Sequence, residues 1–139
     1  MSGSAPQQRS AAVIIAAEPQ LFVSDIEAAC AFFRDKLGFR VVFVYGAPPF
    51  YGQVARDGAR VNLRCAVPAV IDPGRRYAQQ LLSASLTVAS AGEIATLAQE
   101  FQQAGVAFAQ ALQDKPWGTR DFIVRDPDGN LLLFAGPAT

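Results

Sequence analysis

The ionisable side chains of this chain limit the chemistry that it can do. The sequence has twelve acidic and twelve basic residues, no histidine and two cysteines. Serine or cysteine nucleophiles therefore lack their usual histidine base, and a lysine base could come only from Lys36 or Lys115. Lys36 lies at a predicted helix end, where lysine usually complements the helix dipole or is solvated. No glycine-rich phosphate-binding motif is present, and no sequence feature pairs two carboxylates for acid–base work.

A second set of side chains could bind a ligand without transforming it. Aromatic residues concentrate in and around predicted strands: Phe43, Tyr45, Phe50, Tyr51, Trp117 and Phe122. Aromatic walls suit flat, conjugated or amphipathic ligands, since each ring removes much apolar area from water. Strand alternation favours core positions for Phe43 and Phe122. Trp117, the only tryptophan, and Tyr51 each precede a glycine, so either core filling or a pocket wall fits them.

The polar candidates lie beside these aromatic residues. Asn62 and Arg64 share one face of a predicted strand by their spacing of two, and Arg120 follows Trp117 closely. Facing inward, Arg64 could pair with an anionic ligand or with Glu18; facing outward, it is an ordinary solvated charge. Glu18 itself could be a ligand-site carboxylate or a rim residue.

Two helices of similar design must position these side chains. Asp25 is a predicted N-cap for an apolar stripe of residues 26–37, which Gly38 ends. Ser90 opens a capping box with Glu93, and Gly105 ends that second helix.

Strand-like runs flank each helix in the same order. Strands are predicted near 18–23, 39–45, 51–56, 60–65, 83–88, 107–112, 120–125 and 131–135. An Asp-Gly hairpin closes each half, Asp57-Gly58 in the first and Asp126-Pro127-Asp128-Gly129 in the second. The chain is therefore predicted to repeat a βαβββ unit. Each half has an apolar face that it cannot cover alone, so the two halves should associate.

Composition sets the outer limits. A chain of 139 residues fits one self-supporting domain, at 17–139, with halves at 17–66 and 82–136, a loop at 67–81 and a flexible leader at 1–16. Balanced charge indicates neither a nucleic-acid nor a membrane partner, and no apolar run is long enough to span a bilayer. Cys30 and Cys65 have no metal or redox spacing and are expected to be buried thiols in a cytoplasmic protein.

Three phrases of the sequence resemble those of the vicinal-oxygen-chelate superfamily. They are VSDIEAACAFFRDKLGF (23–39), FYGQVARDGARVNL (50–63) and PWGTRDFIVRDPDGN (116–130). That superfamily comprises glyoxalase I, extradiol dioxygenases, fosfomycin-modifying enzymes and the bleomycin-resistance binding proteins. The third phrase is most similar to the bleomycin-resistance branch. The resemblance implies an α+β fold of paired βαβββ modules whose curled mixed sheets surround a cleft.

Enzymes of the superfamily hold one divalent metal through His, Glu or Gln side chains from both halves. The resemblance places three of these positions on or near Glu18, Ser83 and Leu133. Together these are one carboxylate, one hydroxyl and one aliphatic side chain, which do not make a metal cage. Nearby oxygen donors, Gln20, Gln53 and Asn62, are neutral and would hold a hard cation only weakly.

These observations predict a non-catalytic, cofactor-free protein of the bleomycin-resistance type that sequesters an antibiotic-like small molecule as a homodimer. The expected binding residues are Trp117, Tyr51, Phe50, Phe43, Tyr45, Asn62, Arg64, Arg120, Phe122 and Glu18. Bleomycin-like drugs are cationic, however, and balanced charge does not indicate an acidic groove for them. The alternatives are a metal-dependent lyase, isomerase or dioxygenase of the same superfamily and a dimerising regulatory domain without a ligand.

Overall fold

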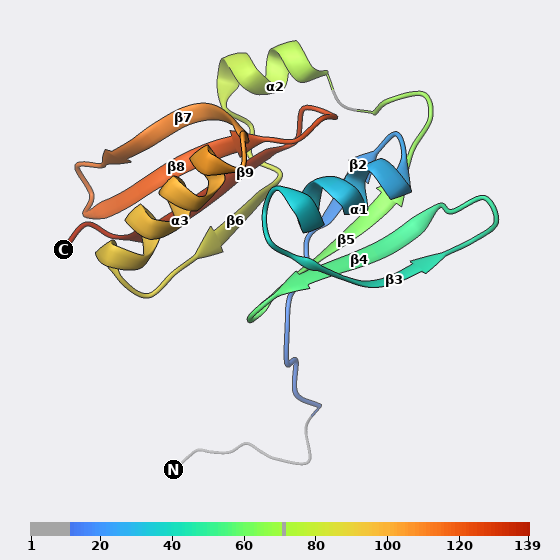
Figure 1. The fold of residues 1–139 in the computed structure, drawn as a ribbon, viewed down its shortest axis with the longest axis horizontal. Helices are drawn as coiled ribbons and strands as arrows, with labels where there is room; N and C mark the ends of the chain where they lie inside the picture. Colours follow the sequence, from blue (N-terminus) through green and yellow to red (C-terminus); the bar gives the residue numbers. More distant parts are fainter. Residues whose placement is uncertain (1–11, 71) are drawn as a thin grey trace.

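The computed structural model describes residues 12–70 and 72–139, which form two similar units side by side (Figure 1). The first unit contains β2 (Gln20–Val23), α1 (Ile26–Asp35), β3 (Arg40–Tyr45), β4 (Tyr51–Arg56) and β5 (Ala59–Cys65). The second contains β6 (Ala84–Thr87), α3 (Ala91–Gln103), β7 (Ala107–Asp114), β8 (Thr119–Arg125) and β9 (Leu131–Pro137). The predicted βαβββ repeat is confirmed.

Both units have the same sheet topology. The strand order is β2-β5-β4-β3 in the first sheet and β6-β9-β8-β7 in the second. In each, the strand before the helix pairs in parallel with the last strand, and the other neighbours are antiparallel. The fold is therefore α+β with two open mixed sheets, as the sequence predicts.

Local signals set the element boundaries. Every predicted strand lies within two residues of the observed one at each end. The Asp25 carboxylate accepts a hydrogen bond from the Ala28 amide, and the Ser90 hydroxyl accepts one from the Glu93 amide, both at 3.1 Å. Gly38 and Gly105 follow the helices with φ of +75° and +77°, values that favour glycine. Both predicted caps are confirmed.

The prediction of an element-free loop between the halves is wrong. A short helix, α2 (Pro73–Gln79), forms there. Asp72 caps it by accepting a hydrogen bond from the Arg75 amide at 3.2 Å. Proline and glycine are typical of turns, but proline is also favoured in the first turn of a helix, where its missing N–H is not needed.

Each long helix covers one face of its own sheet. In the first unit α1 buries Ile26, Ala29, Cys30 and Phe33 against β4 and its neighbours. A Cβ on Gly52 would lie 3.4 Å from Ile26 Cγ2, so glycine permits close approach of strand and helix. The opposite face of each sheet is not covered by that unit's long helix. This helix-free face is therefore the one available for binding.

The second unit is packed around aromatic rings. Phe101 of α3 contacts Phe122 and Phe134 of the sheet edge-on, with ring centroids 5.8 and 5.1 Å apart. Its helix also buries Ile94 and Ala98. These side chains join those beneath α1 in one continuous hydrophobic core across both halves.

Polar contacts also connect the halves. Arg56 of β4 donates two hydrogen bonds to Glu100 of α3, at 2.7 and 3.0 Å. The Asn130 side chain donates to the Phe22 carbonyl at 3.0 Å and to the Asp126 carboxylate at 2.9 Å. Burial raises the pKa of Asp126, although hydrogen bonds from Asn130 and Asp128 oppose that shift. The second hairpin thus packs against the first half.

The thiols and the N-terminal segment complete the fold. Cys30 is free and buried, with a pKa raised chiefly by that burial, and Cys65 is free and half-buried. The predicted leader falls partly outside the described residues; from Ala12 to Ala16 the chain has no helix or strand, and Val13, Ile14 and Ile15 are exposed. Within residues 12–70 and 72–139, the helices are all too short or too polar to span a membrane.

Candidate functional site

The face of the first sheet that points away from α1 gathers most of the predicted binding residues. Strand pairing aligns Tyr45, Tyr51, Arg64 and Phe22 in one row across the sheet. Side chains of directly paired residues point to the same side of a sheet. The residues that alternate with them, such as Leu21 and Leu63, are buried on the α1 side. We call this surface the aromatic face and define it by Phe22, Phe43, Tyr45, Phe50, Tyr51, Asn62 and Arg64.

The aromatic side chains of this face contact one another while remaining open. Phe43 lies 5.7 Å from Tyr51 between ring centroids, and Tyr45 lies 5.7 Å from Phe50 in an edge-on arrangement. Tyr45 is 66% exposed and Phe43 is 39% exposed, so the core interpretation of Phe43 is wrong. A one-residue bulge between Val41 and Phe43 turns Phe43 to the open side, which simple alternation does not reveal.

A polar network occupies the neighbouring row. The Gln53 amide donates to Glu18 at 3.2 Å and to Asn62 at 2.9 Å, and Arg60 donates to Gln53 at 3.0 Å. Glu18 is therefore held by amide groups, and the pairing with Arg64 that the sequence left open is not formed. Arg64 instead lies over the Phe50 ring, 6.0 Å from its centroid.

Trp117 lies on the turn between β7 and β8. Its side chain is 72% exposed, so a core role is excluded. The Lys115 ammonium lies 5.3 Å from the indole centroid and 3.0 Å from the buried Asp121 carboxylate. Gln110 donates to the same carboxylate at 2.7 Å. A nearly buried ion pair thus supports one side of an exposed indole.

Two predicted residues lie elsewhere. Phe122 is 0% exposed and packs against Phe101 and Phe134 on the α3 side of the sheet. The core interpretation of Phe122 is therefore confirmed, and its prediction as a binding residue is wrong. Alternation along a half-buried strand was the signal for this. Arg120 binds Asp114 at 2.6 Å, and this hydrogen bond lowers the pKa of that exposed carboxylate.

A single chain does not bring Trp117 to the aromatic face. Figure 1 shows the β7–β8 connection and the β3–β4 connection at opposite ends of the molecule. Tyr45 and Tyr51 flank the second of these connections, and Trp117 lies in the first. The sequence placed the aromatic residues in one set, but the fold divides them between two surfaces.

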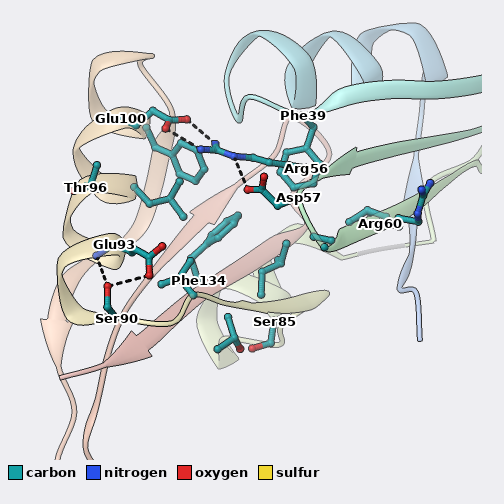
Figure 2. Close-up of a pocket in the computed structure, with 18 of the residues that line it drawn as sticks. Phe39, Arg56, Asp57, Arg60, Ser85, Ser90, Glu93, Thr96, Glu100 and Phe134 are labelled. Atoms are coloured by element: carbon teal, nitrogen blue, oxygen red, sulfur yellow. Dashed lines mark hydrogen bonds and ion pairs between the residues drawn. The ribbon is translucent and has the colours of Figure 1, made fainter. Parts of the chain in front are cut away.

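A cavity lies between the halves (Figure 2), and the residues that define the aromatic face do not line it. It measures about 890 Å³ and is walled by apolar side chains that include Phe39, Leu97 and Phe134. Two pairs of its polar side chains bind each other: Arg56 with Glu100, and Ser90 with Glu93 (Figure 2). No sequence signal predicts this cavity, because the hairpin at 57–58, β6 and α3 meet only through the packing of the halves.

The structure also places the three positions that correspond to superfamily metal ligands. Glu18 contacts Gln53 and Asn62, whereas Ser83 donates to Asn130 at 3.0 Å and accepts from Arg76. Leu133 is aliphatic. Across residues 12–70 and 72–139, His, Cys, Asp and Glu side chains form no group of three that could hold a metal.

Paired βαβββ modules with open mixed sheets define a class of fold. The family model described as "Glyoxalase/Bleomycin resistance protein/Dioxygenase superfamily" matches residues 14–134. The chain therefore belongs to the glyoxalase/bleomycin resistance protein/dioxygenase superfamily. A search of curated proteins finds no significant match.

Solved structures support the same fold. A glyoxalase/bleomycin resistance protein/dioxygenase from Alicyclobacillus acidocaldarius is 17% identical, with a TM-score of 0.71, covering 88% of this chain and 91% of that one. A bleomycin resistance determinant encoded on transposon Tn5 is 19% identical (TM-score 0.69; 91% and 100% covered). The bleomycin-binding protein of Streptomyces verticillus, in complex with copper(II)-bleomycin, is 23% identical (TM-score 0.65; 89% and 97% covered). At these identities the likeness concerns the fold.

Proposed function

We propose that this protein binds and sequesters a planar aromatic or amphipathic small molecule, without making or breaking a bond. The observation that carries the proposal is the aromatic face, on which Phe22, Phe43, Tyr45 and Phe50 are all exposed. Soluble proteins rarely leave contiguous apolar surface of this kind uncovered unless it binds something. The names of the similar structures, two of them bleomycin-related, support a role of the bleomycin-resistance type.

Stacking supplies the affinity in this proposal. A flat ligand laid across the face would cover the Phe43–Tyr51 and Tyr45–Phe50 pairs together. Apolar burial contributes about 25 cal/mol per Å² removed from water, and ring stacking adds roughly 0.5–1.5 kcal/mol per pair. Asn62 and Arg64, at the centre of the sheet, would orient the ligand by hydrogen bonds.

A homodimer would complete the site. The β7–β8 connection, which contains Trp117, and the β3–β4 connection, which Tyr45 and Tyr51 flank, lie at opposite ends of the molecule (Figure 1). One ligand can therefore contact both only if the indole comes from a second copy. Lys115 supports the indole and binds Asp121. Asp121 pairs with Ala135, which points to the side opposite Phe134, and Phe134 faces α3. Trp117 is thus anchored on the helix-free side of its sheet, as the aromatic face is on its own. Two copies with these sides facing each other would form two equivalent grooves.

Trp117 fluorescence tests the proposal, because this residue is the sole indole. Titration with a panel of aromatic antibiotics and metabolites should change its emission saturably for at least one compound. The Tyr51→Ala variant should weaken that binding about tenfold, whereas Tyr77→Ala, an exposed tyrosine on α2, should not. If no compound binds, the ligand-free regulatory domain is the better interpretation.

Metal analysis separates this proposal from the enzymatic alternative. Protein purified without chelators should contain no stoichiometric divalent metal, and Glu18→Gln should leave its metal content unchanged. One equivalent of metal that is lost in Glu18→Gln would favour a metal-dependent enzyme of the superfamily and overturn the proposal.

A further inference from the structure

We infer that the ligand of the aromatic face is a planar anion, such as an aromatic carboxylate or phenolate. This inference rests on the proposed function and adds the charge of the ligand to it. The observation is an excess of arginine on a surface whose chain has no net charge. Arg40, Arg60 and Arg64 all lie on the helix-free side of the first sheet.

Strand register establishes the placement of these arginines. Arg40 pairs with Ala55, and Ala55 pairs with Arg60, which puts the three side chains in one row. Ala55 lies two residues from Gln53 and four from Tyr51 on the same strand, and residues separated by an even number point to the same side. This row is therefore on the same side as the aromatic face. Arg64 lies on the same side in the row of Tyr51 and Phe22, and the row of Gln53 and Asn62 separates it from Arg40 and Arg60.

These cations are not balanced by carboxylates. Each ion pair found in residues 12–70 and 72–139 involves other arginines or Lys115. Glu18 is the carboxylate held on this face, and its partners are the amides of Gln53 and Asn62. The face therefore has more positive than negative charge, which attracts anions and disfavours cations.

Arg64 has the surroundings of an anion-recognition group. Its guanidinium lies over Phe50, and its cross-strand neighbours are Tyr51 and Phe22. A planar guanidinium can stack on a ring while its N–H groups bind a carboxylate with two parallel hydrogen bonds. An aromatic anion lying on these rings would satisfy both requirements at once.

Three probes that share one ring system test the inference. Anthracene-9-carboxylate is negative at neutral pH, 9-anthracenemethanol is neutral and 9-(aminomethyl)anthracene is positive. Binding of each is followed by the fluorescence anisotropy of the probe at low salt. The carboxylate should bind the full chain about tenfold more tightly than the alcohol, and the amine should bind most weakly. Added salt should reduce the differences.

Variants assign the preference to Arg64. Arg64→Gln should abolish most of the carboxylate's advantage over the alcohol, and Arg64→Lys should retain part of it. Arg75→Gln removes the same charge from exposed α2 and should leave the preference intact. Far-UV circular dichroism identifies any variant that fails to fold. If Arg64→Gln fails to fold, Arg64→Lys and the three-probe comparison on the native chain test the inference.

The outcomes distinguish the two proposals. Equal binding of the three probes, or a preference for the amine, would overturn the anionic ligand and leave the proposed binding function standing. An anionic preference that persists unchanged in Arg64→Gln would overturn the role of Arg64. Failure of every probe to bind would count against both proposals.

Discussion

At the scale of single residues, the two predicted strand phenylalanines have opposite roles. Phe122 is fully buried among rings, whereas Phe43 lies on the open side of its sheet. Phe122→Ala should lower the free energy of unfolding by about 3–5 kcal/mol, because a large buried side chain leaves a cavity. Phe43→Ala should change it by less than about 1 kcal/mol and should weaken aromatic ligand binding instead. Urea unfolding and probe titration measure the two effects; equal stability losses would contradict the assignment.

Also at the residue scale, Arg56 connects the two halves through two hydrogen bonds to Glu100. It donates to Glu100 and to the Leu37 carbonyl, at 2.7 and 2.8 Å, and the Glu100 contact raises its pKa. Because the pair is partly exposed, Arg56→Met should cost about 1 kcal/mol in urea unfolding. Arg34→Met removes the exposed pair with Asp35 and should have no measurable effect. Similar losses in both variants would show that a general charge effect is being measured.

At the scale of elements, the second hairpin depends on one backbone conformation. Gly129 has a φ of +85°, and a Cβ there would lie 3.0 Å from the Pro73 side chain at the start of α2. Gly129→Ala should therefore destabilise the protein by about 1–2 kcal/mol or more. Gly58 in the first hairpin has open space around it, so Gly58→Ala is the matched control and should cost less. Thermal unfolding compares them, and an equal effect would contradict this account.

At the scale of the whole molecule, the helix-free sides of the sheets should join two copies. Sedimentation equilibrium should give twice the chain mass of 14.8 kDa. Ala135→Arg places a charge on the helix-free side of β9 and should shift the protein toward monomer with its helix content unchanged. Ala78→Arg on exposed α2 should remain dimeric. A wild-type monomer, or an unaffected Ala135→Arg dimer, would contradict the proposed assembly.

The sequence determined the residue-level caps and the order of the elements, because the signals for both are local. Asp25 and Ser90 cap helices through amides three residues away, and the two Asp-Gly hairpins fix neighbouring strands. The repeat of cap, apolar stripe and hairpin therefore predicted the βαβββ order and the strand bounds. The same local logic failed at α2, because proline and glycine are compatible with both a turn and a helix start.

Only the tertiary structure decided which side chains share a surface. The bulge before Phe43 exposes that ring, the Gln53 amide binds Glu18, and strand register places Arg40 and Arg60 on the same side as the aromatic face. Each of these relations depends on pairing between strands that are distant in the chain, and strand alternation alone cannot supply it. The separation of Trp117 from Tyr51, and the cavity between the halves, likewise arise from how the two modules pack.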